Sequence, residues 1–144
     1  MARIKLELPK TLRFSTTIKV RISDINYGNH LSNDAYLSMI HEARMQFFQS
    51  FNYSEKNFGG VAVIMGDVAI VYKKECFYGE ELRIEVDAND LGARSFDLYY
   101  RFIKEDNSIA CEAKTGMVCY DYTAAKTAAI PDDVRKLFSG EKLS

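Results

Sequence analysis

Residues 20–48 read VRISDINYGNHLSNDAYLSMIHEARMQFF and join two contrasting patterns. The first half crowds Asp, Asn, His and Ser side chains into a short stretch, whereas the second half repeats apolar residues at steps of three and four. Steps of this size place side chains on one side of an α-helix. The sequence therefore predicts a polar loop that runs directly into an amphipathic helix of about five turns.

The ends and faces of this helix follow from the same stretch. Ser32 or Asn33 can cap its first turn, and Asp34 is well placed near the positive end of the helix dipole. The predicted apolar face is formed by Tyr36, Leu37, Ile40, Ala43, Phe47, Phe48 and Phe51.

Strand patterns lie on both sides of the predicted helix. Residues 14–22 alternate between apolar and polar side chains, which is typical of a half-buried strand. Residues 61–72 read VAVIMGDVAIVY, an apolar run rich in β-branched residues, which predicts a long strand buried on both faces. We expect a bulge at Gly66 and a structural, hydrogen-bonded role for Asp67.

Three further alternating runs, at residues 82–86, 96–102 and 109–119, are joined by short polar turns. Short connections favour antiparallel neighbours. The stretch IPDDVRKLF predicts a short final helix that starts at Pro131. We expect one α+β domain over residues 1–144, in which an antiparallel sheet covers the long helix.

Composition excludes several classes of function. With 19 basic and 20 acidic side chains, the net charge of −1 gives no overall field to attract nucleic acid or an anionic membrane. No segment approaches the roughly 18 apolar residues of a membrane span. The three cysteines lack C-x-x-C spacing and predict neither a disulfide framework nor a metal site, which favours a cytoplasmic location.

The order of elements resembles the hotdog fold, in which a five-stranded antiparallel sheet wraps around one long central helix. The polar loop and helix also resemble the 4-hydroxybenzoyl-CoA thioesterase-like hotdog proteins, with their D-x-D-x-x-G-H-x-x-N-x-x-Y and E-A-R motifs. The first part of that pattern is carried here by Asp24, His30, Asn33 and Tyr36, the second by Glu42, Ala43 and Arg44. A later Y-x6-G-[DE]-x-L motif is matched by Tyr72, Gly79, Glu80 and Leu82.

One position departs from that family. The second carboxylate of D-x-D, its nucleophile or base, is Asn26 here, and an amide cannot take up a proton at neutral pH. Gly28 and Asn29 also stand in swapped order before the histidine. The family's carboxylate mechanism therefore does not transfer directly.

Plant acyl-ACP thioesterases offer a second resemblance. They combine D-x-D-x-N-x-H-V-N-N with Y-R-R-E-C, and this chain keeps the histidine spacing at His30 and has YKKEC, with Glu75 and Cys76 in the matching places. That resemblance implies catalytic roles for His30 and Glu75. We expect Cys76 to be an inert core thiol.

Together the resemblances imply hydrolysis of an acyl-CoA or acyl-carrier-protein thioester. Backbone N–H groups near Asn33 would stabilise the oxyanion, and His30 would exchange protons with water and the leaving thiol. Glu75 would orient His30 or act as the base itself, and Asn26 would hold the water or the thioester oxygen. Asp24 is a candidate substrate-binding residue, and we expect it to serve the site by bracing the loop through backbone N–H groups.

The resemblance also suggests how coenzyme A is held. Arg94 and Ser95 match a family segment that contacts the nucleotide, and Lys73 and Lys74 are weaker candidates. No metal or redox cofactor is implied, because coenzyme A enters as part of the substrate. The family points to a homodimer built by joining sheets, or to a tetramer, with Glu75 or Arg94 able to serve the neighbouring subunit.

Two other functions remain open at this point. Hotdog enoyl-CoA hydratases carry G-D-x-N-P-x-H, but their histidine follows Asp by five positions, whereas His30 follows Asp24 by six. A non-catalytic acyl-thioester binding module is the other alternative, because Asn26 replaces a carboxylate.

Overall fold

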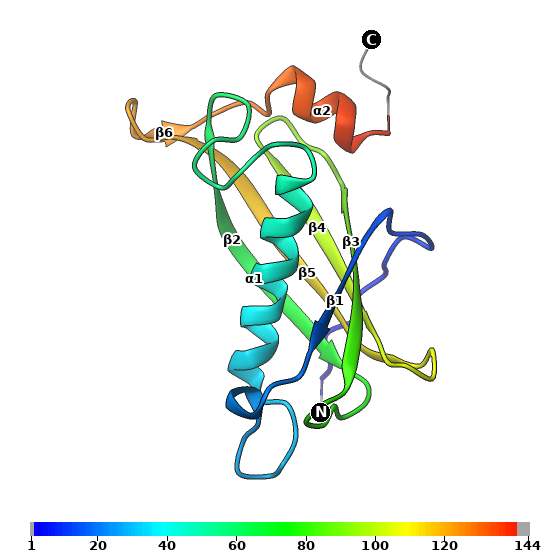
Figure 1. Cartoon of the computed structure of the whole chain (residues 1–144). Coiled ribbons are helices and arrows are strands. Elements are labelled where there is room, and N and C mark those ends of the chain that lie inside the picture. The colour runs from blue at the N-terminus through cyan, green and yellow to red at the C-terminus, as the bar shows by residue number, and fades with distance from the viewer. Residues whose placement is uncertain (1, 141–144) are drawn as a thin grey trace.

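The computed structural model describes residues 2–140, in which one antiparallel sheet carries the long helix α1 on one face (Figure 1). The elements are β1 (Phe14–Lys19), the 3-10 turn η1 (Ile22–Asp24), α1 (Asn33–Gln49), β2 (Ala62–Tyr72), β3 (Glu81–Asn89), β4 (Ser95–Ile103), β5 (Ile109–Asp121), β6 (Lys126–Thr127) and α2 (Asp132–Phe138). The predicted domain of residues 1–144 extends beyond the described residues at both ends.

The sheet has the strand order β1-β3-β4-β5-β2, and the short β6 adds to β5. All pairs are antiparallel, so the predicted α+β class and antiparallel pairing are confirmed. The strand count differs from five because the chain turns back after β5 and forms β6. No helix within residues 2–140 combines the length and the apolar character that crossing a bilayer requires.

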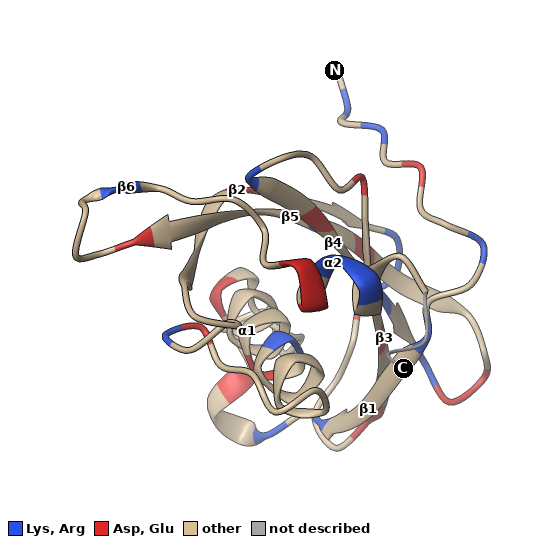
Figure 2. Ribbon diagram, turned by 90° about the horizontal axis from the view of Figure 1, so that it is seen from above, with Lys and Arg blue, Asp and Glu red and all other residues tan. Residues whose placement is uncertain are grey.

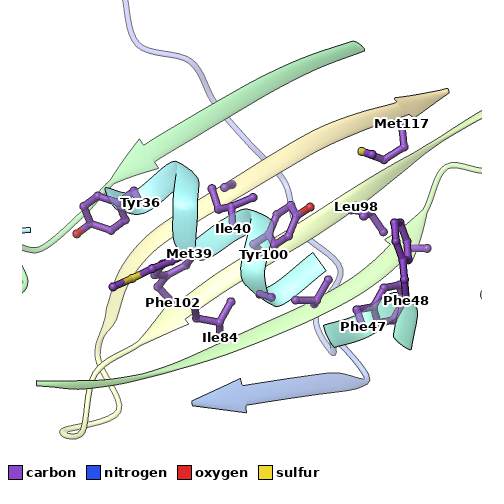
Figure 3. Packing of buried hydrophobic residues seen from close by; sticks show 14 of the residues in the cluster. Tyr36, Met39, Ile40, Phe47, Phe48, Ile84, Leu98, Tyr100, Phe102 and Met117 are labelled. Carbon is purple, nitrogen blue, oxygen red and sulfur yellow. The ribbon is translucent and has the colours of Figure 1, made fainter. Parts of the chain in front are cut away.

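The apolar face of α1 packs against the sheet. Figure 3 shows side chains of α1 facing side chains of the strands, among them Met39, Ile40, Phe47, Ile84, Leu98, Tyr100 and Phe102. The buried positions of α1 follow steps of three and four, as predicted, but the stripe runs through Met39 and Arg44 and leaves Leu37 42% exposed. The buried Arg44 guanidinium donates to the Tyr100 hydroxyl at 3.4 Å and faces Glu55 at 3.5 Å, which offsets its charge.

The burial of β2 differs from the prediction. The sequence predicts a strand buried on both faces, but β2 lies at the edge of the sheet, where Ile64, Met65, Val68 and Tyr72 are exposed. An apolar run indicates that a strand is covered by other parts of the protein or by a partner. Within residues 2–140, however, no strand pairs with the outer edge of β2. The predicted bulge is confirmed, because the register shifts between Met65 and Asp67.

Asp67 is hydrogen-bonded as predicted. Its carboxylate accepts from the Lys114 ammonium at 2.9 Å and from the Gly116 N–H at 2.8 Å, and the Lys114 contact lowers the pKa of Asp67. A Cβ at Gly116 would collide with that carboxylate, so a larger residue there would displace the Asp67 side chain.

The β1 strand is shorter than the predicted 14–22. Its burial alternates through Lys19, after which Val20 exchanges hydrogen bonds with the β2–β3 loop: Val20 N–H donates to the Glu80 carbonyl, and Gly79 N–H donates to the Val20 carbonyl. The chain then turns through η1, and Ile22 is exposed instead of facing the core. This turn directs the polar loop toward the start of α1.

The last helix within residues 2–140 is the short α2. The sequence predicts a start at Pro131, and the helix begins one residue later. Its first turn is acidic and its last turn basic, an order that complements the helix dipole (Figure 2). Phe138 from α2 packs its ring against Phe47 of α1 at 5.5 Å between centroids. The three cysteines are buried and unpaired.

Candidate active site

The polar loop before α1 is a tight hairpin. Ile25 bridges Leu31, the Asn26 N–H donates to the His30 carbonyl at 3.0 Å, and the Asn29 N–H donates to the Asn26 carbonyl at 3.0 Å. Asn29, which directly precedes His30, has a φ of 66°. Glycine and asparagine adopt this left-handed conformation most easily, which explains how Asn29 stands where the family pattern has glycine.

The absence of a side chain at Gly28 leaves room for the His30 ring. A Cβ on Gly28 would lie 3.1 Å from His30 Nε2 and 3.3 Å from Asn26 Oδ1, which is closer than ordinary contact. The Gly28 N–H also donates to Asn26 Oδ1 at 2.9 Å. The asparagine that replaces the family's second carboxylate therefore uses its side-chain oxygen within the loop.

Asp24 braces this loop through hydrogen bonds to residues on both sides of it in the sequence. It is buried, and its carboxylate accepts the Arg21 N–H at 2.8 Å and faces the Arg21 guanidinium at 3.3 Å. Its backbone carbonyl accepts the Ser32 N–H at 3.0 Å, immediately before α1. These contacts are those of a loop brace, and Asp24 is not among the residues that line the cavity beside α1.

That cavity has a volume of about 260 Å³ and opens at the first turn of α1. It is lined by Asn26, His30, Leu31, Asn33, Tyr36, Tyr72, Lys73, Lys74 and Glu75. Residues 26–36 come from the polar loop and the start of α1, whereas residues 72–75 come from the end of β2 and the loop after it. The structure thus brings together Asn26, His30, Asn33 and Glu75.

His30 and Glu75 face one another across this cavity, with His30 Nε2 3.7 Å from Glu75 Oε1. The separation exceeds a direct hydrogen bond, and the His30 side chain is 35% exposed. The two segments are joined by a backbone bond from the Leu31 N–H to the Cys76 carbonyl at 2.8 Å. Hydrogen bonds between catalytic groups are often long in ligand-free enzymes and shorten when substrate binds, so this separation does not exclude a catalytic role.

The helix start provides backbone donors at the same place. Ser32 has extended backbone angles and precedes Asn33, and the first helical acceptor is the Ser32 carbonyl, which takes the Tyr36 N–H at 3.1 Å. The N–H groups before Tyr36 have no partner within the helix. Asp34 is exposed in this turn, where the Ser32 side chain and backbone N–H groups lower its pKa.

Tyr36 and Tyr72, which match motif positions in the sequence, also form an apolar wall of the cavity that the motifs do not predict. The rings of Tyr36 and Tyr72 meet edge to face with centroids 5.1 Å apart. The Tyr36 hydroxyl donates to Cys76 Sγ at 3.5 Å. Burial raises the pKa of both Tyr36 and Cys76, so the hydroxyl and the thiol stay protonated, and the prediction of an inert thiol fits this environment.

Arg94 and Ser95 lie elsewhere. The Arg94 guanidinium donates to the Thr127 carbonyl at 2.8 Å and to its hydroxyl at 3.0 Å. Ser95 begins β4 and lines a separate depression, together with Asp67 and Lys114. Within one chain the structure therefore does not bring this pair to the cavity that holds His30.

Comparison with known proteins identifies the family of this chain. Residues 20–138 match the sequence model of the thioesterase-like superfamily. The chain belongs to the thioesterase-like superfamily. A relative from Aquifex aeolicus (strain VF5), named "Putative esterase", is 30% identical over 97 residues, which cover 62% of this chain and 74% of the relative. The resemblance to hotdog thioesterases noted in the sequence is confirmed.

Solved structures share the fold of this superfamily member. Slr0204 of Synechocystis, a 1,4-dihydroxy-2-naphthoyl-CoA thioesterase, is 21% identical with a TM-score of 0.80, and the match covers 88% of this chain and 96% of that one. SAV2348 of Staphylococcus aureus, solved in complex with CoA, is 17% identical with a TM-score of 0.80 and coverages of 97% and 92%.

Proposed function

We propose that this protein hydrolyses acyl-CoA or acyl-carrier-protein thioesters to a free acid and a thiol. The observation that carries the proposal is that His30 and Glu75 line the same cavity as Asn33 in the first turn of α1. Hydrolysis needs an activated water and a site for a developing oxyanion, and these groups supply both side by side. Membership of the thioesterase-like superfamily supports the same reaction.

In this mechanism the thioester oxygen lies against the N–H groups at the start of α1. As water attacks the carbonyl carbon, the oxygen gains negative charge, which those N–H groups and the helix dipole stabilise. One such donor typically lowers the barrier by about 3 kcal/mol. Asn33 lines the cavity at this point, and the Asn26 amide remains available to the water or to the thioester oxygen through its N–H groups.

His30 carries the proton. It takes a proton from the attacking water, the carbon–sulfur bond breaks as the tetrahedral intermediate collapses, and the same proton passes to the departing thiolate. Glu75 steadies the protonated imidazole across their 3.7 Å separation. This division of work removes the need for the carboxylate that Asn26 replaces.

Coenzyme A itself extends beyond the cavity. A volume of about 260 Å³ falls below the roughly 300–1,000 Å³ of pockets that enclose a whole drug-sized ligand, so the thioester end enters and the nucleotide stays outside. Lys73 and Lys74 at the cavity supply positive charge for phosphates. Arg94 and Ser95 remain candidates for the nucleotide of a substrate bound in a neighbouring subunit.

The assembly and location belong to the same proposal. We assign the sheet and α1 to the hotdog architecture, with five long strands around one central helix and β6 as an extension. The exposed apolar edge of β2 favours a homodimer in which two β2 strands pair, or a tetramer of such dimers. Three buried free thiols are consistent with a cytoplasmic location.

A panel of acyl-CoAs incubated with the protein and a thiol-detecting reagent tests the proposal. Release of free thiol with formation of the acid supports hydrolysis. Loss of the crotonyl-CoA enoyl absorbance without thiol release would instead identify a hydratase. Tight binding with neither signal would identify a binding module, the alternative that Asn26 leaves open.

A further inference from the structure

The segment that carries Glu75 has no regular structure of its own. Residues 73–80 connect β2 to β3, and the Glu75 side chain is 65% exposed, so packing does not hold it in place. Neighbouring backbone is fixed: the Lys73 and Lys74 N–H groups both donate to the Ala110 carbonyl, at 2.8 and 3.0 Å. The Glu75 backbone is held by a different contact, which comes from Lys104.

The Lys104 ammonium contacts this segment at three points. It donates to the Glu75 carbonyl at 2.7 Å, pairs with the Glu80 carboxylate at 3.3 Å, and lies 5.3 Å from the centre of the Phe77 ring. The Glu80 carboxylate also accepts the Phe77 N–H at 2.7 Å, which closes the segment on itself. The side chain of Lys104 is only 14% exposed, so its neighbours restrict the positions that the ammonium can adopt.

Lys104 is itself held by a short hairpin. It follows β4 directly, its N–H donates to the Ser108 carbonyl at 2.9 Å, and its carbonyl accepts the Asn107 N–H at 2.9 Å. Lys104 directly follows the last residue of β4, and strands hold side chains more precisely than loops do. The inner strand β4 therefore sets the position of the Lys104 ammonium, and the ammonium in turn sets the position of the Glu75 backbone.

We propose that Lys104 is a positioning residue that holds Glu75 opposite His30. The inference rests on the proposed hydrolysis, and it gives Lys104 and Glu80 roles that neither the cavity lining nor the reaction assigns. An ammonium suits this task because its three donors can serve a carbonyl and a carboxylate at once. A misplacement of about 1 Å in a catalytic group is enough to lower turnover as much as a hundredfold.

The chain has two histidines, His30 and His41, so their ring signals in a nitrogen-15 spectrum test the inference without any turnover. His41 contacts Glu55 and serves as a reference inside the same spectrum. We expect Lys104→Met to displace the His30 signals in the direction seen with Glu75→Gln, and to leave those of His41 in place. His30 signals that stay at their wild-type positions in Lys104→Met overturn the inference.

Kinetics on the full-length protein provide the second test. We expect Lys104→Met to lower kcat about tenfold or more and Lys104→Arg to restore part of that loss. When Glu75 is already Gln, Lys104→Met should change kcat by less than about twofold, because its effect passes through Glu75. An equal loss in both backgrounds would assign Lys104 a general structural role instead.

A matched control is Lys114→Met, which removes another largely covered lysine, one that pairs with the carboxylates of Asp67 and Asp97 on the outer face of the sheet. It should keep wild-type kcat and His30 signals. If Lys104→Met does not fold, Glu80→Gln weakens the same anchor and should displace the His30 signals less, in the same direction. A wild type that releases no thiol would refute the proposed hydrolysis, while the ring signals would still decide the role of Lys104.

Discussion

The two ends of α1 differ in kind. At the carboxyl end, the rings of Phe47, Phe48, Phe58, Phe96 and Phe138 meet with centroids 5.0 to 6.0 Å apart. At the amino end, polar side chains and backbone N–H groups face an open cavity. The difference shows that one helix can be anchored at one end by ring packing and left free at the other for chemistry. Changes at the two ends should therefore affect different measurements.

The largest effect is expected at the ring-packed end. Phe48 is fully buried, and Phe48→Ala should lower the free energy of unfolding by about 3–5 kcal/mol, because a large cavity replaces the ring. Urea denaturation measures this loss. Leu37→Ala on the exposed side of the same helix is the control, with an expected loss of about 1 kcal/mol or less. Equal losses for the two variants would contradict the comparison.

At the open end the effect should fall on rate. We expect His30→Ala to lower kcat/KM about a hundredfold or more while the free energy of unfolding changes little, since the ring is partly exposed and serves as the proton carrier. Steady-state thiol release and urea denaturation on the same preparation measure both quantities. His41→Ala, which removes the other histidine, should retain wild-type kcat/KM. Near-normal turnover of His30→Ala would exclude it from the mechanism.

A thiol on the α2 side of the molecule should make stability depend on pH. Burial raises the pKa of Cys119 to about 11, so between about pH 9 and 11 the folded chain binds a proton that the unfolded chain has released. Stability must then fall as the pH rises through this window, by about 2–3 kcal/mol from this thiol. Urea denaturation at several pH values measures the slope. Cys119→Ala should reduce the slope, and an unchanged slope would contradict this assignment.

The smallest effect is expected beside His30. Gly28→Ala introduces a methyl group 3.1 Å from His30 Nε2, so the ring must shift by a few tenths of an ångström, and kcat should fall about tenfold or less. Gly92→Ala, whose methyl group meets Ser95 at 3.4 Å, is the matched control and should keep wild-type kcat. If both variants have the same kcat, the absence of a side chain at Gly28 does not determine the position of the His30 imidazole.

The ring-packed end and the helix were largely predictable from the sequence. The three-and-four spacing locates most of the buried positions of α1, since it depends only on helix geometry. It missed Ala35, Met39 and Arg44 and wrongly included Leu37, because the buried stripe is two residues wide at each turn. The burial of Arg44 also depends on Glu55, which lies in a different segment. The exposed edge of β2 was also missed, since an apolar run does not tell which partner covers it.

The open end was predictable where motifs mark it. His30, Asn33 and Glu75 were selected from motif positions, and they line one cavity. Lys104 could not be selected, because its contacts with Glu75 and Glu80 arise only when two separate turns approach each other. The proposed nucleotide contacts of Arg94 and Ser95 stay a prediction, since one chain alone does not bring them to His30.

The strand order has a consequence for the sequence of folding events. β3, β4 and β5 pair with their neighbours in the chain, whereas β1 and β2 attach at opposite edges to strands that are synthesised much later. Because pairings between strands far apart in the sequence cost more loop-closure entropy, we expect the antiparallel strands β3, β4 and β5 to pair first. β1 and β2 would then pair with a sheet of β3, β4 and β5 that is already formed, so that His30 and Glu75 come together only in the last step of folding. Pulse-labelled hydrogen exchange that protects β1 before β4 would refute this order.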